Sequence, residues 1–144
     1  MKAIINTRLI MEDCIIWDGA ITFQGNTIVS VGKAAEVEIP AGTEIIDARG
    51  KYTAPGLIDI HNHGGEKCPF DEDPLECAKF FLKHGQTTVL PTFYQTLSLE
   101  QMLDAADKIR QAQKHPIGRV LNGIYMEGPY MSADGSFKED MKWG

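Results

Sequence analysis

The chain has 144 residues, of which 43% are hydrophobic, and it carries a formal net charge of −6. This length suffices for one domain with a core or for part of a larger fold. The negative charge argues against a nucleic-acid-binding surface, which is normally basic. No apolar run approaches the roughly 20 residues of a membrane span, and the N-terminus lacks the features of a signal peptide. We therefore expect no nucleic-acid or membrane partner.

Short strands are predicted through residues 1–54, where turn signals at Gly25-Asn26 and Pro40-Ala41-Gly42 separate apolar runs. The runs that indicate strands are 3–10, 15–17, 20–23, 27–31 and 44–46. Their regular spacing predicts a small all-β module, either a sandwich or a barrel-like sheet. Packing and stability are the expected roles of this module.

At Pro55 the pattern changes. The apolar run 57–60 shows no clean alternation, which is typical of a strand buried on both faces. A helix is predicted after a polar loop, with Asp73 as its N-cap, Pro74 at the first helical position and Gly85 at its end.

The same alternation of strand and helix continues along the chain. A β-branched strand at 87–90 stops at Pro91, and a second helix begins at Ser98, with Gln101 completing a capping box. The run 119–126 indicates a third buried strand. The order β-α-β-α-β predicts a parallel sheet with helical crossovers, as either an open α/β sheet or a (β/α) barrel.

Two histidines and a glutamate follow these predicted strands. His61 and His63 close the first strand and Glu127 closes the third. Side chains alternate faces along a strand, so the two imidazoles are expected to point the same way. Barrel active sites lie at the carboxyl ends of the strands, and two imidazoles with a carboxylate suit zinc or iron(II). The sequence therefore predicts a metal site at His61, His63 and Glu127.

Other interpretations of these residues stay open. A His-x-His pair occurs by chance or for structural reasons, and Glu127 before Gly-Pro suits a turn cap. Thr92, at the end of the second strand, suits a hydroxyl that satisfies the backbone. The three cysteines, Cys14, Cys68 and Cys77, show no Cys-x-x-Cys spacing, which favours reduced thiols in a cytoplasmic protein over zinc ligands.

Three stretches together resemble the N-acetylglucosamine-6-phosphate deacetylases of the amidohydrolase superfamily: PGLIDIHNHGG at 55–65, HGQTTVLPTFYQT at 84–96 and GIYMEGPYMS at 123–132. The resemblance implies a distorted (β/α)8, TIM-like barrel preceded by a small β-sandwich module. Residues 1–54 would be the N-terminal half of that module, and residues 55–144 the first three βα units of the barrel. It implies removal of the acetyl group from N-acetylglucosamine 6-phosphate, giving glucosamine 6-phosphate and acetate. It also implies that Glu127, His61 and His63 bind one or two divalent ions.

In that family the general-base aspartate and two further metal-binding histidines lie on later strands. A complete barrel needs about 250 residues, so we expect this chain to be the N-terminal portion of a longer enzyme, inactive by itself. The expected partners are a small-molecule amino-sugar phosphate and further copies in a homo-oligomer. Two alternatives remain: another amidohydrolase acting on cyclic amides or dipeptides, and a non-catalytic fragment that binds metal or oligomerises.

Overall fold

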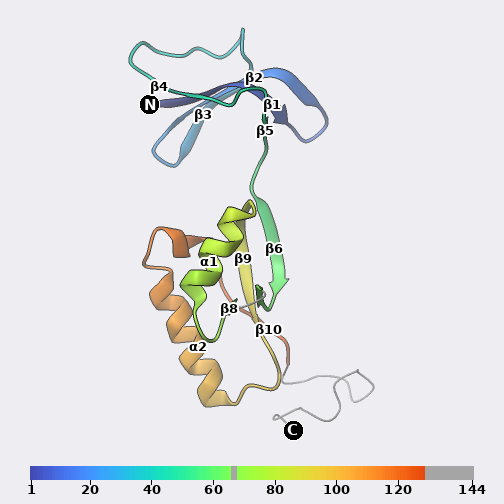
Figure 1. Ribbon diagram of the computed structural model, residues 1–144, viewed down its shortest axis with the longest axis vertical. Coiled ribbons are helices and arrows are strands. Elements are labelled where there is room, and N and C mark those ends of the chain that lie inside the picture. The colour runs from blue at the N-terminus through green and yellow to red at the C-terminus, as the bar shows by residue number, and fades with distance from the viewer. Residues whose placement is uncertain (66–67, 129–144) are drawn as a thin grey trace. The chain divides into compact units, whose positions relative to one another are not determined.

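The computed structural model describes residues 1–65 and 68–128, and the chain divides into two compact units, Met1–Pro55 and Gly56–Gly144 (Figure 1). The last residues of the third family-like stretch, 129–132, therefore lie outside the described residues. Within the described ranges, no helix combines the length and the apolar character that a membrane crossing requires.

The first unit is a five-stranded sheet. Its strands are β1 (Lys2–Ile10), β2 (Ile15–Gln24), β3 (Thr27–Lys33), β4 (Glu44–Asp47) and β5 (Tyr52–Thr53). Strand β1 pairs antiparallel with β2 and parallel with both β4 and β5, and β3 lies on the other side of β2. Residues 1–55, all of which the structure describes, form this one sheet and not the second sheet that a complete sandwich would have.

One predicted break in this sheet is wrong. The runs 15–17 and 20–23 form one strand, because β2 continues through Asp18 and Gly19. A Cβ atom on Gly19 would lie 2.5 Å from the Leu9 Cγ atom of the neighbouring strand. The glycine therefore permits a close approach between strands, and it does not make a turn.

The second unit is a mixed α/β structure with a partial parallel sheet. Strands β6 (Leu57–Asn62), β9 (Gln86–Phe93) and β10 (Tyr125–Met126) pair in the order β10-β9-β6, and both pairings are parallel. Helices α1 (Pro74–Lys83) and α2 (Leu99–Ala112) lie in the two crossovers (Figure 1). A short antiparallel pair, β7 (Gly64–Gly65) with β8 (Cys68–Pro69), follows β6 and was not predicted.

Both helices begin where the capping signals predict. The Asp73 side chain accepts a hydrogen bond from the Glu76 backbone N–H at 3.1 Å, and Pro74 occupies the first helical position. At the start of α2, Ser98 and Gln101 form a complete capping box. These bonds pair backbone N–H groups that a helix start otherwise leaves unsatisfied.

The core of the second unit lies between the two helices and β9. Its buried members are Phe70, Cys77, Ala78, Phe81, Val89, Phe93, Met102, Ala105, Ile109, Ala112, Val120 and Leu121. Strand β6 contributes none of them. Leu57, Ile58 and Ile60 are 62%, 69% and 65% exposed, so the prediction that this strand is buried on both faces is wrong. The reason is its position, because β6 is an edge strand within the described sheet.

The third predicted strand is also largely wrong. Residues Ile117–Val120 form a 3-10 helix, η1, and β10 has only two residues, both about half-exposed. A Cβ atom on Gly118 would lie 1.8 Å from the Ala112 carbonyl oxygen, so the chain turns back tightly against the end of α2. The short β10 still pairs with the end of β9, and Glu127, the next residue, therefore lies at that end of the sheet.

Candidate metal centre

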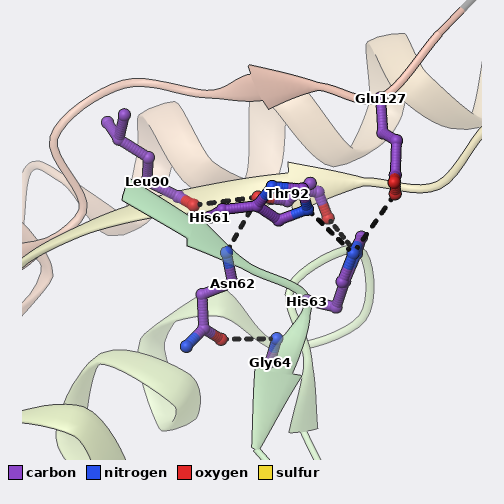
Figure 2. Close-up of polar contacts among 7 residues, drawn as sticks. All are labelled: His61, Asn62, His63, Gly64, Leu90, Thr92 and Glu127. Atoms are coloured by element: carbon purple, nitrogen blue, oxygen red, sulfur yellow. Dashed lines mark hydrogen bonds and ion pairs between the residues drawn. The ribbon is translucent and has the colours of Figure 1, made fainter. Parts of the chain in front are cut away.

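The three predicted metal ligands meet at the carboxyl ends of the parallel strands (Figure 2). His61 lies near the end of β6, His63 follows that strand, and Glu127 follows β10. The Nε2 atoms of His61 and His63 are 3.3 Å apart, and the His63 Nε2 atom lies 3.3 Å from the Glu127 Oε2 atom. One ligand atom from each residue lies within 4.8 Å of the other two.

Two of these separations fit the ligands of a single small cation. A tetrahedral zinc ion with ligand bonds of about 2.0–2.1 Å holds neighbouring ligand atoms roughly 3.3–3.4 Å apart. The two 3.3 Å separations match that spacing, with His63 at the shared corner. Two imidazoles and a carboxylate also form a donor set that accepts zinc or iron(II), and three protein ligands leave a position for water.

The surroundings of His63 suit a ligand. Its Nδ1 atom lies 3.2 Å from the Thr92 carbonyl oxygen. A carbonyl only accepts, so in the neutral imidazole Nδ1 carries the hydrogen and Nε2 keeps its lone pair. Metal-binding histidines are commonly held in this way. The lone pairs of His63 Nε2 and Glu127 Oε2 then face each other, which a shared cation would make favourable.

Two tyrosine rings stack on the faces of the imidazole rings. The Tyr94 ring stacks on His63 with centroids 3.8 Å apart and an interplanar angle of 7°. The Tyr125 ring stacks on His61 at 4.8 Å and 29°. Neither tyrosine was a predicted site residue. The signal was present, because Tyr94 follows Thr92 by two residues and Tyr125 precedes Glu127 by two, the period of a strand face.

Strand β6 is irregular between Asp59 and Asn62, the stretch that contains His61. Asp59 pairs with Val89 and Asn62 pairs with Pro91, so three steps along β6 (59 to 62) lie opposite two steps along β9 (89 to 91). This extra residue is a β-bulge, a feature that redirects side chains. Simple alternation therefore does not explain why the two imidazoles converge, although they do converge as predicted.

The bulge also explains why Pro91 does not end β9, contrary to prediction. The strand continues to Phe93, and Pro91 lies opposite Asn62, where the regular ladder is already interrupted. The Asn62 N–H donates instead to the Thr92 Oγ1 atom at 2.9 Å, and that hydroxyl donates to the Leu90 carbonyl at 3.3 Å (Figure 2). Thr92 thus satisfies the backbone, as one of its interpretations proposed.

Comparison with known proteins finds enzymes whose sequences are similar to part of this chain. No protein-family model matches the chain. It is 36% identical over 106 residues to an adenine deaminase of Bacillus velezensis, which covers 74% of this chain and 16% of the relative. It is 47% identical over 51 residues to an imidazolonepropionase of Chloroflexus aggregans, covering 34% of this chain and 12% of the relative.

A solved structure is similar over most of the chain. The N-acetylglucosamine-6-phosphate deacetylase from Pasteurella multocida matches with a TM-score of 0.73 and 25% identity, covering 92% of this chain and 35% of that chain. The present chain therefore spans 35% or less of the length of each of these three proteins. The shared fold and the sequence relatives together show that the chain belongs to the amidohydrolase superfamily.

Proposed function

We propose that this chain forms part of a metal-dependent hydrolase with a (β/α)8 barrel, and that His61, His63 and Glu127 hold its divalent ion, zinc or iron(II). The observation that carries the proposal is the convergence of these three side chains at the carboxyl ends of parallel strands. A bound ion would supply a water of lowered pKa and would polarise the bond to be hydrolysed.

Residues of this chain would orient the side chains that hold the ion. Thr92 holds the His63 imidazole through its carbonyl oxygen, so that Nε2 is the atom offered to the ion. Glu127 offers Oε2 to the same position, from a side chain that is 23% exposed. The adjoining tyrosine rings limit rotation of both imidazoles.

N-acetylglucosamine 6-phosphate is the substrate that we propose, with glucosamine 6-phosphate and acetate as products. The likeness to the Pasteurella multocida deacetylase over 92% of this chain supports this choice, together with the three family-like stretches. The described residues add no further histidine, cysteine or acidic residue to the cluster. A general base would then come from elsewhere in the barrel, and we predict that the 144-residue chain alone releases no acetate.

A second candidate is hydrolytic removal of an amino group from a nucleobase. The 36% identity to an adenine deaminase over 106 residues favours it. Both reactions need an activated water beside a metal, so the cluster is compatible with either. They differ in the product released, which is acetate in one case and ammonia in the other.

Product analysis separates the two candidates. The longest natural polypeptide containing these 144 residues is loaded with Zn²⁺ or Fe²⁺ and incubated with N-acetylglucosamine 6-phosphate or with adenine. Acetate release that a chelator abolishes and added metal restores would support the deacetylase. Ammonia release from adenine without acetate release would support the deaminase. Loss of either activity in a His63→Ala variant would connect it to this centre, and absence of both would reject both substrates.

A further inference from the structure

The Asp59 carboxylate accepts three hydrogen bonds beside the segment that carries His61 and His63. Its Oδ1 atom accepts a hydrogen bond from the His61 backbone N–H at 3.2 Å. Its Oδ2 atom accepts from Asn62 Nδ2 at 2.6 Å and from Gln86 Nε2 at 3.1 Å. The side chain is partly buried, and it is not a member of the candidate ligand cluster. Its contacts indicate a role that is different from metal binding.

Asn62 extends this network past the ligands. Its side-chain oxygen accepts from the Gly64 N–H at 2.8 Å, while its own backbone N–H donates to the Thr92 hydroxyl at 2.9 Å (Figure 2). The segment from Asp59 to Gly64 is therefore tied by side-chain bonds on both sides of each histidine. Two of these bonds join it to β9, through Gln86 and Thr92.

These hydrogen bonds occur where the sheet itself provides little restraint on the backbone. The bulge between Asp59 and Asn62 interrupts the ladder to β9, so backbone N–H groups near it need other partners. Apolar packing does not hold the strand either, since Ile58 and Ile60 are mostly exposed. The polar network thus restrains the backbone that carries His61 and His63 where ladder pairing and apolar packing are weak.

We propose that Asp59 is a positioning residue for the metal centre. With Asn62 it pins the β6 bulge and so holds the two imidazole Nε2 atoms at their 3.3 Å separation before an ion arrives. The inference rests on the proposed metal site. Preorganisation reduces the ordering that binding must otherwise impose, and loss of an outer-shell partner commonly weakens metal affinity about 10- to 100-fold.

An exchange of the two side chains tests the pairing. In Asp59→Asn the new amide group would face the Asn62 amide, and two donors would meet. In Asn62→Asp two carboxylates would meet. In the double variant the donor and the acceptor exchange places, position 59 keeps an oxygen for the His61 N–H, and position 62 keeps one for the Gly64 N–H. Gln86 Oε1, buried and without a hydrogen-bond partner, could accept from the new amide after a flip.

Asp104→Asn is the matched control. Asp104 lies on α2 and pairs at the surface with Lys108 at 2.8 Å. Zn²⁺ affinity is measured on the full chain by competition with a chromophoric chelator, and the Co²⁺ absorption spectrum reports the coordination geometry. Circular dichroism verifies that each variant is folded. If Asp59→Asn does not fold, Asn62→Asp and the double variant still give the decisive comparison.

We expect wild type and Asp104→Asn to bind one ion alike, and each single variant at the site to bind it about 10- to 100-fold more weakly with an altered Co²⁺ spectrum. The double variant should recover most of the affinity and the wild-type spectrum. Folded single variants that bind like wild type would overturn this inference alone. A double variant as weak as the singles would also overturn it. A wild-type chain without metal affinity would overturn the proposed metal site itself, and this inference with it.

Discussion

Strands β9 and β6 are neighbours in one sheet, but different forces hold them. Val89 on β9 is fully buried beneath the two helices, whereas Ile58 on β6 is 69% exposed. The ligand segment belongs to the poorly packed strand, where hydrogen bonds from Asp59 and Asn62 replace apolar burial. The difference indicates that stability and metal binding depend on separate residues, which mutation can test one by one.

The largest effect is expected from removing both histidines of β6. His61→Ala combined with His63→Ala should abolish specific metal binding, because it deletes two of the three converging ligand atoms. Elemental analysis after gel filtration measures the bound metal. His84→Ala is the control, since His84 contacts the Phe80 carbonyl at the end of α1. An unchanged metal content in the double variant would remove these residues from the site.

The packed core beside β9 and the open strand β6 should also respond differently to truncation of a side chain. Phe81 of α1 is 4% exposed in the core, so Phe81→Ala should lower the free energy of unfolding by about 3–5 kcal/mol. Ile58→Ala should change it by less than about 0.5 kcal/mol, because its side chain is largely exposed. Urea unfolding measures both. A large loss in Ile58→Ala would mean that β6 is covered in solution and would break the comparison.

The helices that pack on β9 were also more predictable from sequence than the strand pairing was. Asp73, Pro74 and Ser98 specify helix starts through contacts within one turn, so short-range patterns were sufficient. Strand pairing depends on distant residues. Neither the bulge opposite Pro91 nor the close approach of Gly19 to Leu9 leaves a local mark that distinguishes it from a strand end or a turn.

A smaller effect on the packed side is expected from the α2 cap. Ser98→Ala removes the side-chain acceptor for the Gln101 N–H, so it should destabilise the fold by about 1 kcal/mol. Ser98→Asp retains an acceptor and serves as the control. Metal affinity should remain unchanged in both variants if stability and binding are separate. A parallel loss of affinity in Ser98→Ala would show that they are coupled.

Among the substitutions expected to weaken metal binding, the smallest effect is expected from the aromatic contact at the ends of β6 and β9. Tyr94→Leu removes the ring stacked on His63, a kind of contact worth about 0.5–1.5 kcal/mol, and should weaken Zn²⁺ binding by roughly 2- to 10-fold. Tyr94→Phe keeps the ring and should bind like wild type. Chelator competition resolves these differences. Equal weakening in both variants would assign the effect to the hydroxyl group instead of the stack.

The candidate site was predictable only in part. His61, His63 and Glu127 lie at or just after the ends of parallel strands, and that order brings all three to one edge of the sheet. The network of Asp59, Asn62 and Thr92 arises from the bulge, which is a property of strand register. Sequence patterns could therefore predict which ligands meet, but not what positions them. That these residues bind metal stays a prediction.

The X-ray absorption spectrum of the zinc-loaded chain tests the central claim most directly. If His61, His63 and Glu127 hold the ion, the first shell should contain nitrogen and oxygen alone at about 2.0–2.1 Å, with the outer-shell scattering of two imidazoles. The chain also has three cysteines, and a thiolate ligand would appear as sulfur at about 2.3 Å. A sulfur ligand, or a first shell without imidazole scattering, would contradict the account.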